Sequence, residues 1–229
     1  PQPAGCGRSL LSASQNIRSP PQRGTGGARG EKIPRYALPP RDGERMLWAF
    51  GSAAKHHRLY SPWLRPENCH AGMLGLRGAI APTVGLMEDA VRQIKGLLED
   101  AGVAGAPVGV DIVEPPFLFE MQRQGLKVVD AQQLMLDARQ IKNVDEIMLL
   151  NQAAAMVDGV YQDIVAELRP GVRENEIVAL ASKRLYEMGS DQVEAINAVS
   201  GERCNPHPHN FSDRLIRPGD QAFFDIIHS

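Results

Sequence analysis

The chain has 229 residues, of which 43% are apolar, 23% are charged and 5% are aromatic. This apolar content excludes disorder for most of the chain, and no run of about 18 uncharged apolar residues is present that would predict a membrane span. A balance of 25 basic against 27 acidic residues, with a net charge of −2, argues against a dedicated nucleic-acid surface.

Residues 1–30 differ in composition from the rest of the chain. They are rich in glycine, proline, serine and arginine and contain no acidic residue. Such a segment cannot bury enough apolar surface to offset the entropy lost on ordering, so the composition predicts a disordered tail. The glycines at 24–30 lack the lysine of a phosphate-binding loop and follow no predicted strand, which argues against a nucleotide site there.

An α/β pattern follows a region interrupted by proline and glycine, residues 31–85, in which we expect short elements and long loops. Apolar residues repeat every three and four positions over 86–101, which predicts an amphipathic helix ended by Gly102. The elements predicted next are a strand at 108–112, a short helix that begins at Pro115 and a strand at 126–129. This alternation of helices and strands is typical of a layered α/β domain.

Two longer helices and two strands are predicted after this domain. Asn143 and Glu146 have the spacing of a capping box, and a long helix is expected up to Leu168. We predict that one apolar stripe runs along this helix and is buried; its members are Ile147, Leu150, Ala154, Val157, Tyr161, Ile164 and Leu168. The elements predicted after it are a helix ended by Gly189, a strand at 193–199, a polar loop at 200–213 and a strand at 222–227.

The cysteines indicate the compartment. There are three, Cys6, Cys69 and Cys204, and they form no C-x-x-C pair. An odd, widely spaced set excludes a disulfide scaffold and a zinc site built from cysteine, and it favours a reducing compartment. We therefore expect a cytoplasmic protein.

Asp225 lies within 223–227, the most apolar run near the C-terminus. A carboxylate flanked by large apolar residues is costly unless cations or hydrogen-bond donors pair with it. A divalent metal ion is one such partner, which makes Asp225 a candidate metal ligand. The alternative is that Asp225 faces solvent from an edge strand or caps a turn.

Two histidines, His207 and His209, lie two positions apart in the polar loop before this strand. In an extended strand both side chains would point to one side and could share a metal ion. Pro206 and Pro208 instead favour a polyproline twist of about three residues per turn, which separates the two rings. The pattern favours one histidine that faces a cleft, and a surface loop without function remains the alternative.

Several motifs follow one another in a fixed order. They are 108–111 and 128–130 as strands, 139–147 as a crossing between domains, 168–171 followed by 174–177 as a helix–turn–helix, and Ser200-Gly201, a histidine, 217–220 and Phe224-Asp225 near the C-terminus. In this order they resemble the creatinase/Xaa-Pro aminopeptidase (pita-bread) metallopeptidase family, over about 120 residues.

The resemblance implies an α/β (α+β) fold, with a creatinase-like N-terminal domain at 31–138 and the first half of a pita-bread catalytic domain at 139–229. It implies that Asp225 is the first aspartate ligand of a centre of two divalent metal ions (Mn, Co or Zn). One upstream histidine matches the family's substrate-binding residue; the interval favours His209, with His207 in reserve. The other ligands would follow Ser229, so we expect a chain of these 229 residues to be metal-poor and inactive.

The function implied by the resemblance is that of an aminopeptidase or Xaa-Pro dipeptidase-like hydrolase that cleaves short peptides and forms a homodimer. Ile227 stands where the family usually has glycine. This departure keeps two alternatives open, because a fold does not fix a reaction. One is a non-peptidase member of the same fold, a small-molecule lyase or amidinohydrolase, and the other is a non-catalytic pseudoenzyme that serves as a dimerisation module.

Overall fold

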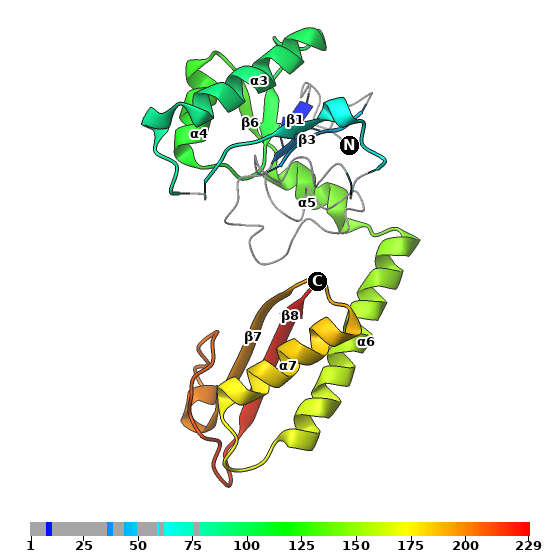
Figure 1. Ribbon diagram of the computed structural model, residues 1–229, viewed down its shortest axis with the longest axis vertical. Coiled ribbons are helices and arrows are strands. Elements are labelled where there is room, and N and C mark those ends of the chain that lie inside the picture. The colour runs from blue at the N-terminus through cyan, green and yellow to red at the C-terminus, as the bar shows by residue number, and fades with distance from the viewer. Residues whose placement is uncertain (1–7, 11–35, 39–43, 50–58, 60–61, 76–77) are drawn as a thin grey trace. The chain divides into compact units, whose positions relative to one another are not determined.

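The computed structural model of the chain describes residues 8–10, 36–38, 44–49, 59, 62–75 and 78–229. These residues form two compact units that divide between Ile141 and Lys142 (Figure 1). Within the described part of the chain, no helix is both long enough and apolar enough to cross a membrane.

The described residues of the first unit form two three-stranded sheets and three α-helices. One sheet is parallel, in the order β1 (Arg8–Leu10), β5 (Val108–Val110) and β6 (Val128–Asp130). In the other, β3 (Met46–Ala49) pairs with β2 (Tyr36–Leu38) in antiparallel and with β4 (Cys69–Ala71) in parallel orientation. The helices are α3 (Leu86–Asp100), α4 (Pro115–Arg123) and α5 (Gln132–Gln140).

Arg8–Leu10 correct the prediction that residues 1–30 are disordered throughout. They form β1, which pairs in parallel with β5 so that Arg8 lies opposite Val108. A segment that pairs with the edge of a strand has its backbone hydrogen-bonding groups satisfied whatever its side chains are. The composition of residues 1–30 indicates only how much apolar side-chain surface they can bury, so it does not reveal such pairing. The other residues of this segment, including the glycine-rich 24–30, lie outside the described residues.

The core of the first unit joins α3 to the second sheet. The predicted stripe of α3 is confirmed, since Val91, Ile94 and Leu98 are all buried. The ring of Trp48 stacks on that of Tyr36, with 5.1 Å between centroids, and its indole N–H donates to the Gln93 side chain at 3.1 Å. The Trp48 ring is thus packed against another ring and its N–H has a hydrogen-bond acceptor, as is usual for a buried indole.

The second unit is a two-stranded antiparallel hairpin with two helices. Its elements are α6 (Val144–Glu167), α7 (Glu174–Met188), β7 (Val193–Ser200), the 3₁₀ turn η4 (Gly201–Cys204) and β8 (Ala222–His228). The predicted capping box is confirmed, because Asn143 and Glu146 exchange side chain-to-amide hydrogen bonds of 2.9 Å. Gly189 ends α7 in the left-handed conformation, with φ 99°. The core is formed by Val160, Ile164, Ile177, Ala181, Leu185, Ile196 and Ile216.

The stripe predicted along α6 is buried only in its C-terminal half. Of its members, Ile164 is buried and Val157, Tyr161 and Leu168 are half-buried, whereas Ile147 is 48% exposed and Leu150 is 56% exposed. The prediction was wrong for the first turns because it took account of periodicity and not of length. At about 1.5 Å per residue, the 24 residues of α6 span about 36 Å, whereas the 15 residues of α7 span about 22 Å. Helix α7 is therefore too short to cover the whole of α6.

Candidate functional site

Asp225 lies in β8, directly opposite Asn197 of β7. The Asn197 side chain is buried, and its Nδ2 donates to Asp225 Oδ2 at 3.0 Å. From α6, the Tyr161 hydroxyl donates to the Phe224 carbonyl at 2.9 Å. Burial raises the pKa of Tyr161, and the negative charge of Asp225 adds to that rise. The Asp225 carboxylate is thus half-buried and held by an amide donor, which differs from the alternative of a carboxylate free in solvent.

The donor chemistry at Asp225 fits one ligand of a hard divalent metal ion. An aspartate oxygen is a normal ligand for such ions, and a hydrogen bond to the other side of the carboxylate, as Asn197 makes, fixes its orientation. Among the residues that the structure describes, no three His, Cys, Asp or Glu side chains are grouped closely enough to hold a metal ion. The described residues therefore offer a single candidate ligand rather than a complete site.

The two histidines of the loop lie next to each other. Their ring centroids are 4.8 Å apart in an edge-to-face arrangement, and the ring of His207 lies 4.6 Å from that of Phe223. The predicted separation of the rings was wrong. The Asn210 amide donates to the Pro208 carbonyl at 2.7 Å, which makes a tight turn at His209 in place of a polyproline twist.

The contact with Phe223 places His207 on the face of the hairpin that carries the Asp225 side chain. Phe223 precedes Asp225 by two residues in β8, so both side chains point to the same face of the hairpin. His207 is half-buried against this face, whereas His209 is exposed and rests on His207.

Both ends of the histidine loop are bound to one buried carboxylate, that of Glu174 at the start of α7. The residue is 1% exposed. Its Oε1 accepts hydrogen bonds of 2.8 Å from the amide and the hydroxyl of Ser200, the last residue of β7. Its Oε2 accepts from the Ser212 amide at 2.9 Å, from the Ser212 hydroxyl at 2.7 Å and from Arg203 at 2.6 Å. Five donors satisfy a charge that would otherwise be costly to bury.

A second ion network lies beside the first and shares Ser200 with it. Arg214 donates to the Ser200 hydroxyl at 2.8 Å, to Asp220 at 2.5 Å and to Glu202 at 2.8 Å. Gly201 permits this approach. Its φ is +58°, and a Cβ on it would lie 2.5 Å from Arg214 Nη2.

This network predicts an acid-dependent contribution to stability. Hydrogen bonds from Arg214 and from the Arg217 amide hold the pKa of Asp220 below its usual range. A depressed folded-state pKa stabilises the fold above the ordinary aspartate pKa of about 3.9, and the contribution is lost as the pH falls through the folded-state value. We expect Asp220→Asn to destabilise the protein at neutral pH and the difference from wild type to narrow in acid.

Thermal unfolding at a series of pH values from neutral down to about 3 tests this expectation. Asp191→Asn, at an exposed position just after α7, is the matched control and should give the wild-type pH dependence. A stability difference between Asp220→Asn and wild type that stays the same at every pH would contradict the assignment.

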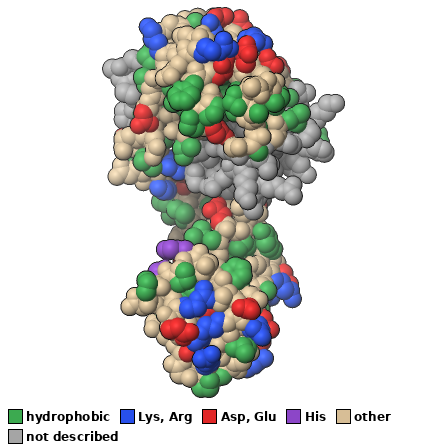
Figure 2. Space-filling model, turned by 90° about the vertical axis from the view of Figure 1, so that its left-hand side faces the viewer, with side chains coloured by type: hydrophobic (Ala, Val, Ile, Leu, Met, Phe, Trp, Pro, Cys, Tyr) green, Lys and Arg blue, Asp and Glu red, His purple; other side chains and the backbone are tan. Residues whose placement is uncertain are grey.

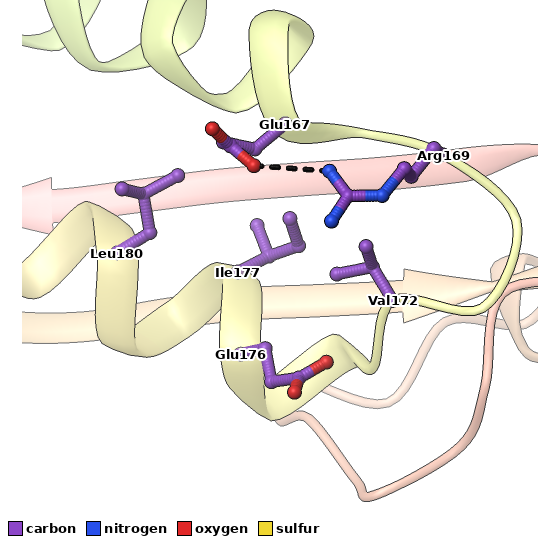
Figure 3. Close-up of a pocket in the computed structure, with 6 residues that line it drawn as sticks. All are labelled: Glu167, Arg169, Val172, Glu176, Ile177 and Leu180. Atoms are coloured by element: carbon purple, nitrogen blue, oxygen red, sulfur yellow. Dashed lines mark hydrogen bonds and ion pairs between the residues drawn. The ribbon is translucent and has the colours of Figure 1, made fainter.

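One surface pocket of the second unit lies apart from these residues. It has a volume of about 270 Å³ and lies where α6 ends and α7 begins (Figure 3). Val172, Ile177 and Leu180 give it apolar walls, and Glu167 and Arg169, which also line it, form an ion pair of 3.1 Å. None of Asp225, His207 and His209 lines this pocket.

The charges on the surface of the second unit are mixed in sign. On the face shown in Figure 2, basic and acidic side chains alternate with apolar ones. No large area of a single sign is visible on that face, in keeping with the balanced composition of the chain.

Residues 148–228 match the sequence model of metallopeptidase family M24. A probable dipeptidase, PepE of Mycobacterium tuberculosis, is 29% identical over 134 residues, which is 56% of this chain and 36% of the relative. These matches confirm the resemblance to the creatinase/Xaa-Pro aminopeptidase metallopeptidases.

Solved structures match almost the whole chain. The X-Pro aminopeptidase of Thermotoga maritima superposes with a TM-score of 0.71 at 16% identity, over 97% of this chain and 57% of that one. The Xaa-Pro dipeptidase of Bacillus anthracis gives 0.64 at 17% identity, over 96% and 56%. These likenesses confirm the predicted fold class, and the chain spans little more than half the length of each of these proteins.

Proposed function

We propose that this chain is part of a metal-dependent aminopeptidase or Xaa-Pro dipeptidase-like hydrolase that cleaves short peptides. The supporting observation is that the segment matching family M24, residues 148–228, contains Asp225 and both loop histidines. In the structure a buried amide holds Asp225, and His207 packs on the same face of the hairpin. The division of the chain into a creatinase-like domain at 31–138 and a catalytic segment at 139–229 is part of this proposal.

In this proposal Asp225 is a metal ligand, and Asn197 keeps its carboxylate oriented. Two bound divalent ions, Mn, Co or Zn, would supply a nucleophile at neutral pH by lowering the pKa of a bound water and would polarise the scissile carbonyl. His209, with His207 in reserve, donates a hydrogen bond to the substrate carbonyl as negative charge develops on its oxygen. His207 packs between Phe223 and His209 and thereby holds the His209 ring in place.

In a protein that carries the remaining ligands, we expect His209→Ala to reduce kcat about 100-fold while metal content is retained, because loss of one donor to a developing oxyanion has an effect of this size. The measurement is steady-state hydrolysis of Xaa-Pro dipeptides together with metal analysis of the purified variant. Asp213→Asn, at an exposed position of the same loop, is the control and should behave as wild type. Loss of metal in His209→Ala would make this histidine a ligand and contradict its assigned role.

A substrate panel with Mn, Co or Zn tests the reaction itself, in a protein that carries the remaining ligands. Cleavage of Xaa-Pro dipeptides is the expected result. Release of a small volatile product without peptide cleavage would instead indicate a lyase of the same fold, and absence of any turnover would indicate a non-catalytic dimerisation module. For a chain of these 229 residues alone we propose little bound metal and no activity, because the resemblance assigns it one ligand, Asp225.

Two further properties belong to the proposal. A cytoplasmic location is proposed because the three cysteines are few and widely spaced, which favours a reducing compartment. A homodimer is proposed from the resemblance, and sedimentation of the purified protein measures it.

A further inference from the structure

Glu174 is a buried charged residue that the proposed reaction does not use. We infer that Glu174 is a positioning residue, which holds the loop at 201–211 so that His207 and His209 face the site of Asp225. The inference deepens the proposed function and rests on it, because the loop acts on substrate through these histidines.

The partners of Glu174 all lie outside its own helix. A glutamate in the first turn of a helix ordinarily stabilises that helix, through its charge or through a capping hydrogen bond. In α7 it is Glu176 that makes the capping bond, by accepting from the Arg173 amide at 2.7 Å. The five hydrogen bonds to Glu174 instead come from Ser200, Arg203 and Ser212. Its carboxylate therefore serves the loop rather than the helix.

Each carboxylate oxygen of Glu174 accepts hydrogen bonds from a different end of the loop. Oε1 binds Ser200, where β7 ends, and Oε2 binds Ser212, where the loop returns. One rigid group thus fixes the distance between the ends, and what lies between them is the segment that carries both histidines.

A direct path leads from Glu174 to His209. Arg203 pairs with Glu174 through Nη1 at 2.6 Å and donates through Nη2 to the Asn210 side chain at 2.9 Å. Asn210 is the neighbour of His209, and its carbonyl accepts from the Ala198 amide of β7 at 3.2 Å. Asn210, next to His209, is held through its carbonyl by β7 and through its side chain by the Glu174–Arg203 pair.

The test is Glu174→Gln, with Glu176→Gln as the matched control on the same turn of α7. A glutamine side chain has the same shape, but its amide group would face either the two donors of Ser200 or the three donors of Ser212 and Arg203. A serine hydroxyl can turn to accept from that group, whereas the backbone N–H of Ser200 or Ser212 cannot. One end of the loop should therefore be released. Glu176→Gln retains an oxygen acceptor for Arg173 and should leave the loop unchanged.

Two readouts follow the loop without substrate. The ring signals of His207 and His209 in nuclear magnetic resonance spectra should shift or broaden in Glu174→Gln, because the rings lie in each other's ring current. Those of His228 should not move, since its ring is held outside the loop by Ser190 and the Ala153 carbonyl. Hydrogen exchange at the Ser200 or Ser212 amide should accelerate about tenfold or more, as loss of a charge-assisted hydrogen bond implies.

In active protein, Glu174→Gln should lower kcat about tenfold or more with metal content retained, as one misplaced oxyanion donor implies. Wild-type histidine signals and amide exchange in Glu174→Gln would overturn the inference. Arg203→Met, which removes a side chain that is 24% exposed and leaves Glu174 in place, answers the same question if Glu174→Gln does not fold. Failure of the wild type to cleave peptides would contradict the proposed function, and the two substrate-free readouts would still decide whether Glu174 positions the histidines.

Discussion

Replacing Asp225 with asparagine is expected to abolish turnover in a protein that carries the remaining ligands, by about 10³-fold or more. Loss of a metal-ligating carboxylate removes several kcal/mol of transition-state stabilisation, and about 1.4 kcal/mol corresponds to a tenfold change in rate. The fold should survive. Asparagine has nearly the same shape, and its carbonyl can accept the hydrogen bond that Asn197 now donates at 3.0 Å.

Alanine at this position provides a second measurement. Asp225→Ala should also be inactive but less stable, by about 1–3 kcal/mol, because it leaves the buried Asn197 amide without its acceptor. Metal analysis, unfolding by urea and hydrolysis rates separate the two effects. Asp158→Asn, on an exposed position of α6, is the control for a lost charge. Turnover near the wild-type rate in Asp225→Asn would show that Asp225 is not a ligand.

Replacing Glu174 with alanine is expected to cause a large loss of stability, about 3–5 kcal/mol, as removal of one partner of a buried ion pair does. The truncation leaves Arg203 without its buried partner and the two serine amides without acceptors. The effect should be confined to the second unit, because Glu174 lies in that unit and its partners do too.

The tryptophans allow this to be measured. Trp48 and Trp63 both lie in the first unit. Urea unfolding followed by tryptophan fluorescence should therefore match wild type, while unfolding followed by far-ultraviolet circular dichroism gains a component at lower urea. Glu174→Gln should fall between wild type and Glu174→Ala. Equal stability of Glu174→Ala and wild type by both probes would show that the buried carboxylate contributes no net stability.

Much of the fold could be predicted where local signals agree with tertiary packing. The capping box at Asn143 and the glycine at 189 mark helix ends through backbone hydrogen bonds that neighbouring residues alone decide. The apolar repeat of α3 marks the face that is buried.

Other elements had no such signal. Helix α5 has no buried residue, and its large apolar residues, Leu134, Met135 and Leu136, are consecutive rather than spaced by three and four, so no helix was predicted there. The three residues of β1 are ordered by pairing with β5, a partner about 100 positions away in sequence, which no local pattern indicates. The first turns of α6 follow the helical period and are nonetheless exposed, because periodicity does not indicate whether a neighbour is long enough to cover the face.

Some residues of the candidate site could likewise be predicted from the sequence, and others could not. Asp225 could be singled out because large apolar neighbours make a carboxylate unusual. Glu174 could not, because a glutamate at the start of a helix is common and the sequence does not reveal that its side chain turns away from that helix. Only the folded chain brings together Ser200, Arg203 and Ser212 around it.

The arrangement around Glu174 has a consequence for engineering and for divergence among relatives. Glu174 holds both ends of the loop between Ser200 and Ser212. We therefore expect that residues between these ends can be exchanged, deleted or inserted without altering strand β8, which follows. The residues between Ser200 and Ser212 thus form a segment that could be replaced as one unit. Other residues could be introduced by exchanging that segment, provided that Ser200, Ser212 and Glu174 are kept together with Arg203, the charged partner of Glu174, and His209.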